Sequence, residues 1–165
     1  MNEEALIYAL PGAIWSLVFP PDVLGVLRGN AQKSKKSREM AGQLYAKNLA
    51  SDRILIDTAT ILTPKRSWFT GVKIDIAAVD AERAMMFAGG LHCLGFWHSH
   101  PEPIPQPSYT DQVLAAKHAV AAREEFTALV FVIIGTETFP DGLGVWVHDG
   151  TKLLRAVNVI PQAVV

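Results

Sequence analysis

The stretch that decides the fold runs from Leu91 to Gln112 and reads LHCLGFWHSHPEPIPQPSYTDQ. Its first part, 91–98, is a mostly apolar run that predicts a buried strand. Prolines then occupy alternate positions from Pro101 to Pro107. Because each proline lacks an N–H donor and restricts the residue before it, this segment cannot be helical. Ser108 is a good N-cap and predicts a helix that continues to about Glu125. A strand, a stiff loop and a helix therefore follow one another here.

Hydrophobic patterning and turn signals predict further elements on both sides of this stretch. Strands and helices do not alternate strictly, so the predicted class is α+β (mixed α/β) rather than a doubly wound parallel sheet. With 165 residues, the chain has the size of one domain, expected to cover 1–165. The expected strands cover 13–19, 40–47, 54–62, 128–134, 143–148 and 152–159, and the expected helices cover 21–28 and 80–88, the second with Asp80 as its N-cap.

The composition limits the kinds of protein that this chain can be. Hydrophobic residues make up 50% of it, enough to offset the entropy of folding. The formal net charge of -1 provides no basic field for binding nucleic acid. The single cysteine, Cys93, excludes a disulfide framework and a thiolate zinc cluster, and it favours a cytoplasmic protein. The acidic start of the chain and the lack of any apolar run of about 20 residues predict neither a signal peptide nor a membrane span.

His98 and His100 stand two positions apart at the end of the predicted strand, so both imidazoles lie on one face of an extended backbone. Such a pair can bind a metal ion, but for the pair alone two half-buried histidines with local hydrogen bonds are the favoured interpretation. Asp111 also has two interpretations. It can complete a capping box with Ser108, or it can supply the third ligand of a zinc site whose fourth tetrahedral position stays open for water.

The spacing of these residues resembles a known signature. His98, His100, Ser108 and Asp111 match the H-x-H-x7-S-x2-D motif of the JAB/MPN (JAMM) metalloprotease family at every position. An upstream segment, 39–44 (EMAGQL), is similar to the family's glutamate followed by glycine and leucine. The resemblance covers nearly the whole chain and implies a cytidine-deaminase-like JAB/MPN domain, in which helices flank a central, mostly antiparallel sheet.

The resemblance also implies roles for individual residues. His98, His100 and Asp111 would bind one Zn2+ per chain. Glu39 would act as the general base, and Ser108 would donate a hydrogen bond to the oxyanion of the tetrahedral intermediate. By spacing alone Glu102, two residues after His100, competes with Glu39 for the role of base.

The function implied by this resemblance is that of a zinc-dependent peptidase or isopeptidase that cleaves the bond after the C-terminal tail of a ubiquitin-like protein. The chain looks most like stand-alone prokaryotic members, which are similar to the deconjugating peptidases of bacterial antiphage operons. A metallopeptidase for small peptides or for a sulfur-carrier precursor would share the same residues. A non-catalytic MPN scaffold is the remaining alternative. The expected partner is the ubiquitin-like substrate, and the sequence does not give the oligomeric state.

Other candidate residues invite simpler interpretations. Ser99 must point away from the histidine face and is expected to be structural. His92 is expected in the core or at a sheet edge, and Cys93 as a small buried hydrophobic residue. His118 and His148 are expected to be solvated.

Overall fold

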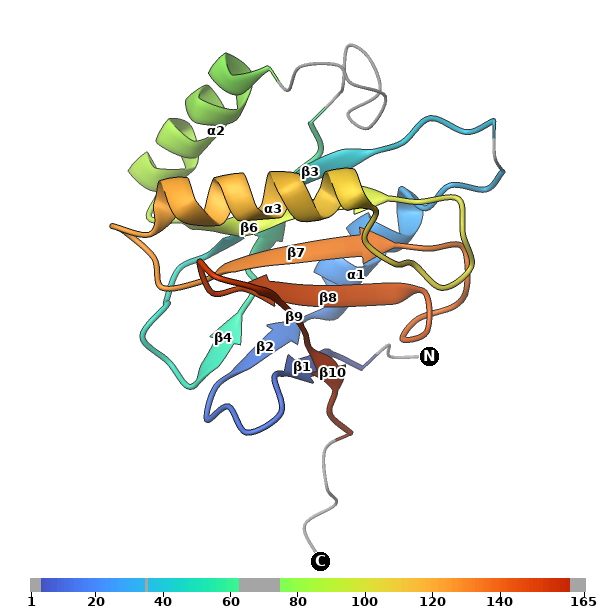
Figure 1. Cartoon of the computed structure of the whole chain (residues 1–165), viewed down its shortest axis with the longest axis horizontal. Helices are drawn as coiled ribbons and strands as arrows, with labels where there is room; N and C mark the ends of the chain where they lie inside the picture. The colour runs from blue at the N-terminus through green and yellow to red at the C-terminus, as the bar shows by residue number, and fades with distance from the viewer. Residues whose placement is uncertain (1–3, 35, 63–74, 161–165) are drawn as a thin grey trace, which may run out of the picture.

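The computed structural model describes residues 4–34, 36–62 and 75–160 (Figure 1). Within these ranges the chain forms a six-stranded sheet, a four-stranded sheet and three helices. The helices are α1 (Pro21–Gly29), α2 (Ile76–Ala88) and α3 (Tyr109–Ala122). The mixed α+β class is therefore confirmed. In the described ranges, no helix is both long enough and apolar enough to span a membrane.

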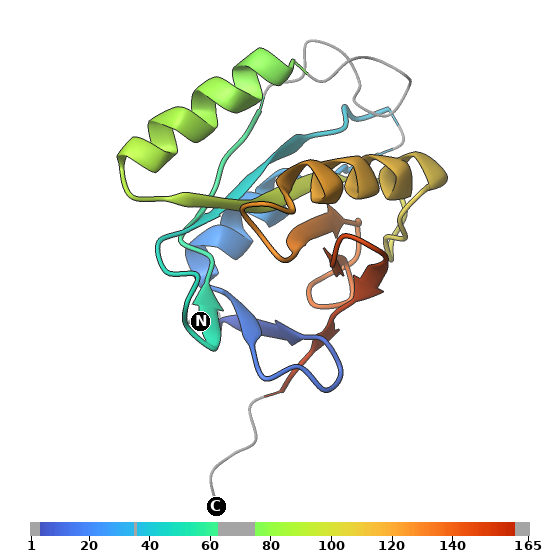
Figure 2. The same ribbon diagram turned by 60° about the vertical axis from the view of Figure 1, so that its left-hand side comes forward.

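The larger sheet has the strand order β5-β3-β6-β7-β8-β9. Every neighbouring pair is antiparallel except β6 and β7, so the expectation of a mostly antiparallel central sheet is confirmed. Helices α2 and α3 cover one face of this sheet, and α1 lies on the other (Figure 2). The strands are β3 (Ala41–Ala46), β5 (Thr58–Ala59), β6 (His92–Ser99), β7 (Leu129–Ile134), β8 (Leu143–His148) and β9 (Leu153–Arg155).

The smaller sheet, which the sequence did not predict, has the order β10-β1-β2-β4. It packs with α1 against the face of the larger sheet that α2 and α3 leave uncovered. The hydrophobic core lies between these layers and includes Phe19, Leu27, Leu44 and Trp97, each of which is fully buried. The strands are β1 (Leu6–Ala9), β2 (Ser16–Phe19), β4 (Arg53–Leu55) and β10 (Val157–Asn158).

Two segments that the sequence predicted as single strands each divide between the two sheets. In the segment 54–62, the N–H of Ile56 donates to Val18 O of the smaller sheet, and the next N–H, of Asp57, donates to Tyr45 O of the larger one. The segment 152–159 divides at Ala156 in the same way, into β9 of the larger sheet and β10 of the smaller one. The chain therefore passes from one layer to the other at both points.

The predicted helix over 80–88 is longer than expected. It begins at Ile76 because Asp75, and not Asp80, is the N-cap, with its side chain accepting the Ala78 N–H. Helix α3 starts after Ser108 as predicted but ends at Ala122, three residues before the expected end.

Candidate metal centre

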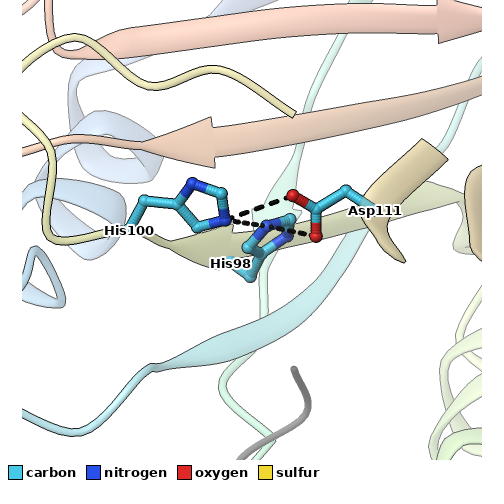
Figure 3. A group of neighbouring side chains, drawn as sticks. All are labelled: His98, His100 and Asp111. Atoms are coloured by element: carbon cyan, nitrogen blue, oxygen red, sulfur yellow. Dashed lines mark hydrogen bonds and ion pairs between the residues drawn. The ribbon is translucent and has the colours of Figure 1, made fainter. Parts of the chain in front are cut away.

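The two histidines of the motif lie where β6 ends. His98 is the last residue but one of β6, and His100 follows the strand directly. Trp97 faces the core, so the alternation of a strand turns His98 to the opposite face, towards α3. The Nε2 atoms of the two imidazoles are 3.0 Å apart (Figure 3). The expected placement of both rings on one face is therefore confirmed.

Asp111, in the first turn of α3, brings a carboxylate to the same point. Its Oδ1 lies 3.2 Å from Nε2 of His98, and its Oδ2 lies 3.2 Å from Nε2 of His100. Asp111 also completes a capping box, because its Oδ2 accepts the Ser108 N–H at 2.6 Å and its own N–H donates to Ser108 Oγ. The two interpretations of Asp111 are thus compatible, since the cap fixes the carboxylate in the orientation that faces the histidines.

The three side chains fit a metal ion. A tetrahedral zinc ion with bonds of about 2.0–2.1 Å holds its ligand atoms about 3.3–3.4 Å apart. The two Nε2 atoms are 3.0 Å apart, and each lies 3.2 Å from a different oxygen of Asp111. With one ligand atom taken from each residue, all three lie within 4.8 Å of one another. Asp111 is only 7% exposed, and each of its carboxylate oxygens faces an imidazole nitrogen at 3.2 Å. The group of His98, His100 and Asp111 can therefore hold a metal ion.

The charges of the group also suit a cation. Burial by itself would raise the pKa of Asp111, but hydrogen bonds from His100 and His98 hold that pKa far below its ordinary value. Burial lowers the pKa of His98, which favours the neutral form that ligates metals. Burial acts in the same direction on His100, but the hydrogen bond and charge of Asp111, with the charges of Glu102 and Glu39, raise its pKa overall. The site thus presents one firmly ionised carboxylate to two imidazoles.

Glu102 lies on the far side of the His100 ring. Its Oε2 is 3.0 Å from Nδ1 of His100, whereas the opposite ring nitrogen, Nε2, faces Asp111. A carboxylate in this position orients a ligating histidine and selects the tautomer that leaves Nε2 free of its proton. From the sequence, Glu102 was predicted only as an alternative to Glu39 for the role of base. Its position two residues after His100 is the signal that could have indicated this supporting role.

Glu39 precedes β3 and is half-buried. The first residue of β3, Ala41, pairs with His98, and the intervening Met40 is hydrogen-bonded to Ser99. Glu39 therefore lies at the histidine end of β6, close enough for its charge to act on His100. The structure thus brings Glu39 and Ser108 to the same end of the sheet as the three candidate ligands, while their catalytic roles stay predictions.

Gly42, three residues after Glu39, allows β3 to pass close to Thr60 and to the Trp97 side chain. A Cβ atom at this position would lie 1.7 Å from Thr60 O and 2.5 Å from Nε1 of Trp97. That space is occupied by a hydrogen bond of 2.8 Å from Trp97 Nε1 to Thr60 O, which ties β6 to the edge of the sheet. Glycine is therefore required where β3 passes this bond.

The proline-rich loop is anchored to the end of β7. The N–H groups of Thr136 and Glu137 donate to the carbonyls of Glu102 and Pro103 at 2.9 and 3.1 Å. Gly135 permits this approach, because a Cβ there would lie 2.2 Å from Pro103 O. The loop is thus fixed to the sheet as well as stiffened by its prolines, and both effects set the distance from the histidines to Asp111.

The remaining histidines lie away from this group. His148 is only 4% exposed, so the expectation that it is solvated is wrong; its Nδ1 accepts the Gly150 N–H in the turn after β8. His118 is half-buried against Phe96 rather than solvated, because helix α3 turns this side chain towards the sheet. His92 and Cys93, at the start of β6, are half-buried as well.

Comparison with known proteins supports the fold and the family. Solved structures that share the fold include two proteins of low sequence identity. A protein from Desulfitobacterium hafniense is 18% identical, with a TM-score of 0.61 over 82% of this chain and 86% of its own. A protein from Salinibacter ruber is 22% identical, with a TM-score of 0.52 over 87% of this chain and 91% of its own. No curated protein matches the chain. Residues 20–147 match the model of prokaryotic homologs of the JAB domain, so the chain belongs to that family, whose members include metallopeptidases and also non-catalytic proteins.

Proposed function

We propose that this protein is a zinc-dependent peptidase or isopeptidase. The observation that supports the proposal is the convergence of His98, His100 and Asp111, whose ligand atoms lie within 4.8 Å of one another. The donor set of two imidazoles and one carboxylate is that of catalytic zinc sites, which keep a fourth position for water or substrate. The presence of all three candidate ligands, with Glu39 at the same end of the sheet, favours an enzyme over a non-catalytic scaffold.

In this proposal each residue has a separate task. His98, His100 and Asp111 hold the ion, with Glu102 orienting His100. Zinc supplies Lewis acidity, which makes water a nucleophile near neutral pH and polarises the scissile carbonyl. Glu39 would accept a proton from the water as its oxygen adds to the scissile carbonyl carbon, and would then return this proton to the leaving amine as the C–N bond breaks. The Ser108 hydroxyl donates to the developing oxyanion, while its oxygen keeps the Asp111 N–H.

The proposed substrate is the C-terminal tail of a ubiquitin-like protein, joined to another group by a peptide or isopeptide bond. The substrate class rests on the resemblance to prokaryotic family members. A structural feature agrees with it: β5 is one of the two edge strands of the larger sheet within the described ranges, and its extension pairs at Leu62 with Ala41, two residues after Glu39. An extended tail can add to such an edge as a further strand.

The test is hydrolysis of ubiquitin-like proteins encoded beside this gene, each fused at its C-terminus to a reporter. We expect release of the reporter from one fusion, loss of release with a chelator, and recovery when zinc is restored. A purified chain that binds no zinc, or that cleaves equally well with chelator, would contradict the proposal. Cleavage of short peptides but of no fusion would instead support the small-peptide alternative.

Substitution of the proposed base sharpens this test. Glu39→Gln should lower kcat by about 10²- to 10⁴-fold, the usual contribution of general acid–base catalysis, and should still bind one zinc per chain. Glu124→Gln is the matched control, because Glu124 is an exposed carboxylate that follows α3, at the opposite end of that helix from Asp111. Full activity in Glu39→Gln, together with loss of activity in Glu102→Gln, would transfer the role of base to Glu102.

A further inference from the structure

Ser99 stands between the two candidate ligands, and the alternation of the strand turns its side chain to the face opposite the imidazoles. It is 0% exposed. Its Oγ accepts the Met40 N–H at 2.9 Å, and its own N–H donates to Met40 O at 2.9 Å. One residue of β6 thus holds both backbone polar groups of Met40.

This pair of bonds lies just outside the regular ladder. The pairing of β3 with β6 ends at Ala41 and His98, so Met40 is one residue beyond it and Glu39 is two. Preceding Glu39 is a loop whose basic residues Lys33, Lys36 and Arg38 are exposed. The bonds between Ser99 and Met40 therefore attach the chain to β6 at the point where this exposed loop leads into β3.

Ser99 is itself held firmly on its other side. It pairs with Ile134 of β7, and the next N–H along the chain, that of His100, donates to Ile134 O at 2.8 Å. Because His98 and His100 are its covalent neighbours, the position of Ser99 relative to the candidate ligands is fixed by the backbone. A group hydrogen-bonded to Ser99 Oγ is therefore fixed relative to those ligands too.

We propose that Ser99 is a positioning residue for the base: by binding the Met40 N–H through its Oγ, it holds the adjacent Glu39 at the edge of the His98–His100–Asp111 group. The inference rests on the proposed function, because it assigns Ser99 a task in that reaction. A general base must lie within hydrogen-bond reach of the proton that it accepts. Small displacements of a catalytic group, of about 1 Å, can cost about 10²-fold in rate.

The experiment uses the zinc-loaded chain and compares Ser99→Ala with the wild type. We expect kcat to fall about tenfold to a hundredfold, while KM and the zinc content per chain stay unchanged. Amide hydrogen exchange at Met40, measured by NMR, should become faster, because its N–H loses the Oγ acceptor, while exchange in Ala41–Ala46 stays as before. Ser99→Thr keeps a hydroxyl oxygen and should restore slow exchange at Met40 and most of kcat.

Tyr8→Phe is the control for a general loss of stability. It removes a different buried hydrogen bond, from the Tyr8 hydroxyl of the smaller sheet to Leu143 O, which involves neither Ser99 nor Met40, and should leave kcat unchanged. Unchanged exchange at Met40 in Ser99→Ala would overturn the proposal, whether or not the chain hydrolyses any substrate. An unchanged kcat in an active Ser99→Ala enzyme would overturn it as well. Failure of the proposed function would look different: the wild type itself would show no chelator-sensitive hydrolysis, whereas the exchange measurement would still report on the Met40 bond.

Discussion

The two ends of strand β6 carry the same kind of residue in different surroundings. At its C-terminal end, His98 and His100 face the carboxylate of Asp111. The other end forms part of a hollow of about 770 Å³ between α2 and α3, where His92, Cys93 and His118 are among the lining residues. Histidine is therefore available at both ends of one strand.

The surroundings decide what each histidine can do. At the far end, the rings pack against aromatic side chains: His92 lies 5.6 Å from Phe87 and His118 lies 4.5 Å from Phe96, measured between ring centroids. The guanidinium of Arg83 lies over the Phe96 ring, so a positive charge is close to these rings, although the carboxylate of Glu125 also lines the hollow. At the metal end the nearby charge is negative and the ring nitrogens converge on it. The comparison teaches that a converging carboxylate, rather than the number of histidines, makes a metal site.

The largest expected effect comes from removing that carboxylate. Asp111→Asn keeps an oxygen to accept the Ser108 N–H, so helix α3 should still start normally, but the negative ligand is lost. Mutations of groups that merely support a ligand cost about 10- to 100-fold in metal affinity, so this change should weaken zinc binding more than about 100-fold. Titration against a competing chelator measures it.

Substitutions at the far end provide the contrast. His92→Asn and His118→Asn should leave zinc affinity unchanged, because neither ring belongs to the converging group. Zinc binding that survives Asp111→Asn but is lost in His118→Asn would reverse the assignment of the two ends.

A smaller effect is expected on thermal stability. Because folding brings the three ligands together, zinc should stabilise the folded chain. At a free zinc concentration of 1,000 times Kd, the free energy of unfolding should rise by about 4 kcal/mol. For a chain of this size that corresponds to an increase in Tm of about 8–16 °C. Scanning calorimetry with and without chelator measures it. Asp111→Asn should show no such increase, and an equal increase in both proteins would place the ion elsewhere.

The smallest effect concerns the positive charge at the far end. Burial lowers the pKa of His118, and the charge of Arg83 lowers it further. Arg83→Gln removes that charge, which makes protonation of the ring less costly, so the pKa of His118 should rise while burial keeps it below its ordinary value. NMR titration of the His118 ring protons measures the change. A fall in this pKa, or no change, would show that the Arg83 charge does not act on the ring.

The sequence predicted the part of the fold that carries the metal group because its signals there are local. An apolar run, four alternating prolines and an N-cap serine follow one another within Leu91–Gln112, and the structure has β6, the anchored loop and α3 at these places. For His98, His100 and Asp111, the same stretch left a metal site and local hydrogen bonding both open, and the resemblance favoured the metal site. The roles of Glu39 and Ser108 come from resemblance, and the structure adds only their location.

Pairings between distant residues could not be predicted in this way. Strand β1 is four residues long, and Tyr8 pairs with Asn158 near the other end of the chain, which no local pattern reveals. The divisions at Ile56 and Ala156 have the same cause, since hydrophobicity shows that a segment is extended but not which sheet it joins. For α2, Asp80 is a good cap by residue type, but the helix formers before it let Asp75 cap the helix first.

The two-residue strand β10 has a consequence for self-association. By pairing with β1 it covers a longer edge whose backbone N–H and C=O groups would otherwise be open to a strand from another molecule. The edge that β10 itself presents is too short to serve as a template for such pairing. A chain shortened to end at Ala156 would keep every residue of the metal group and yet expose β1, and we expect it to aggregate more readily than the longer chain.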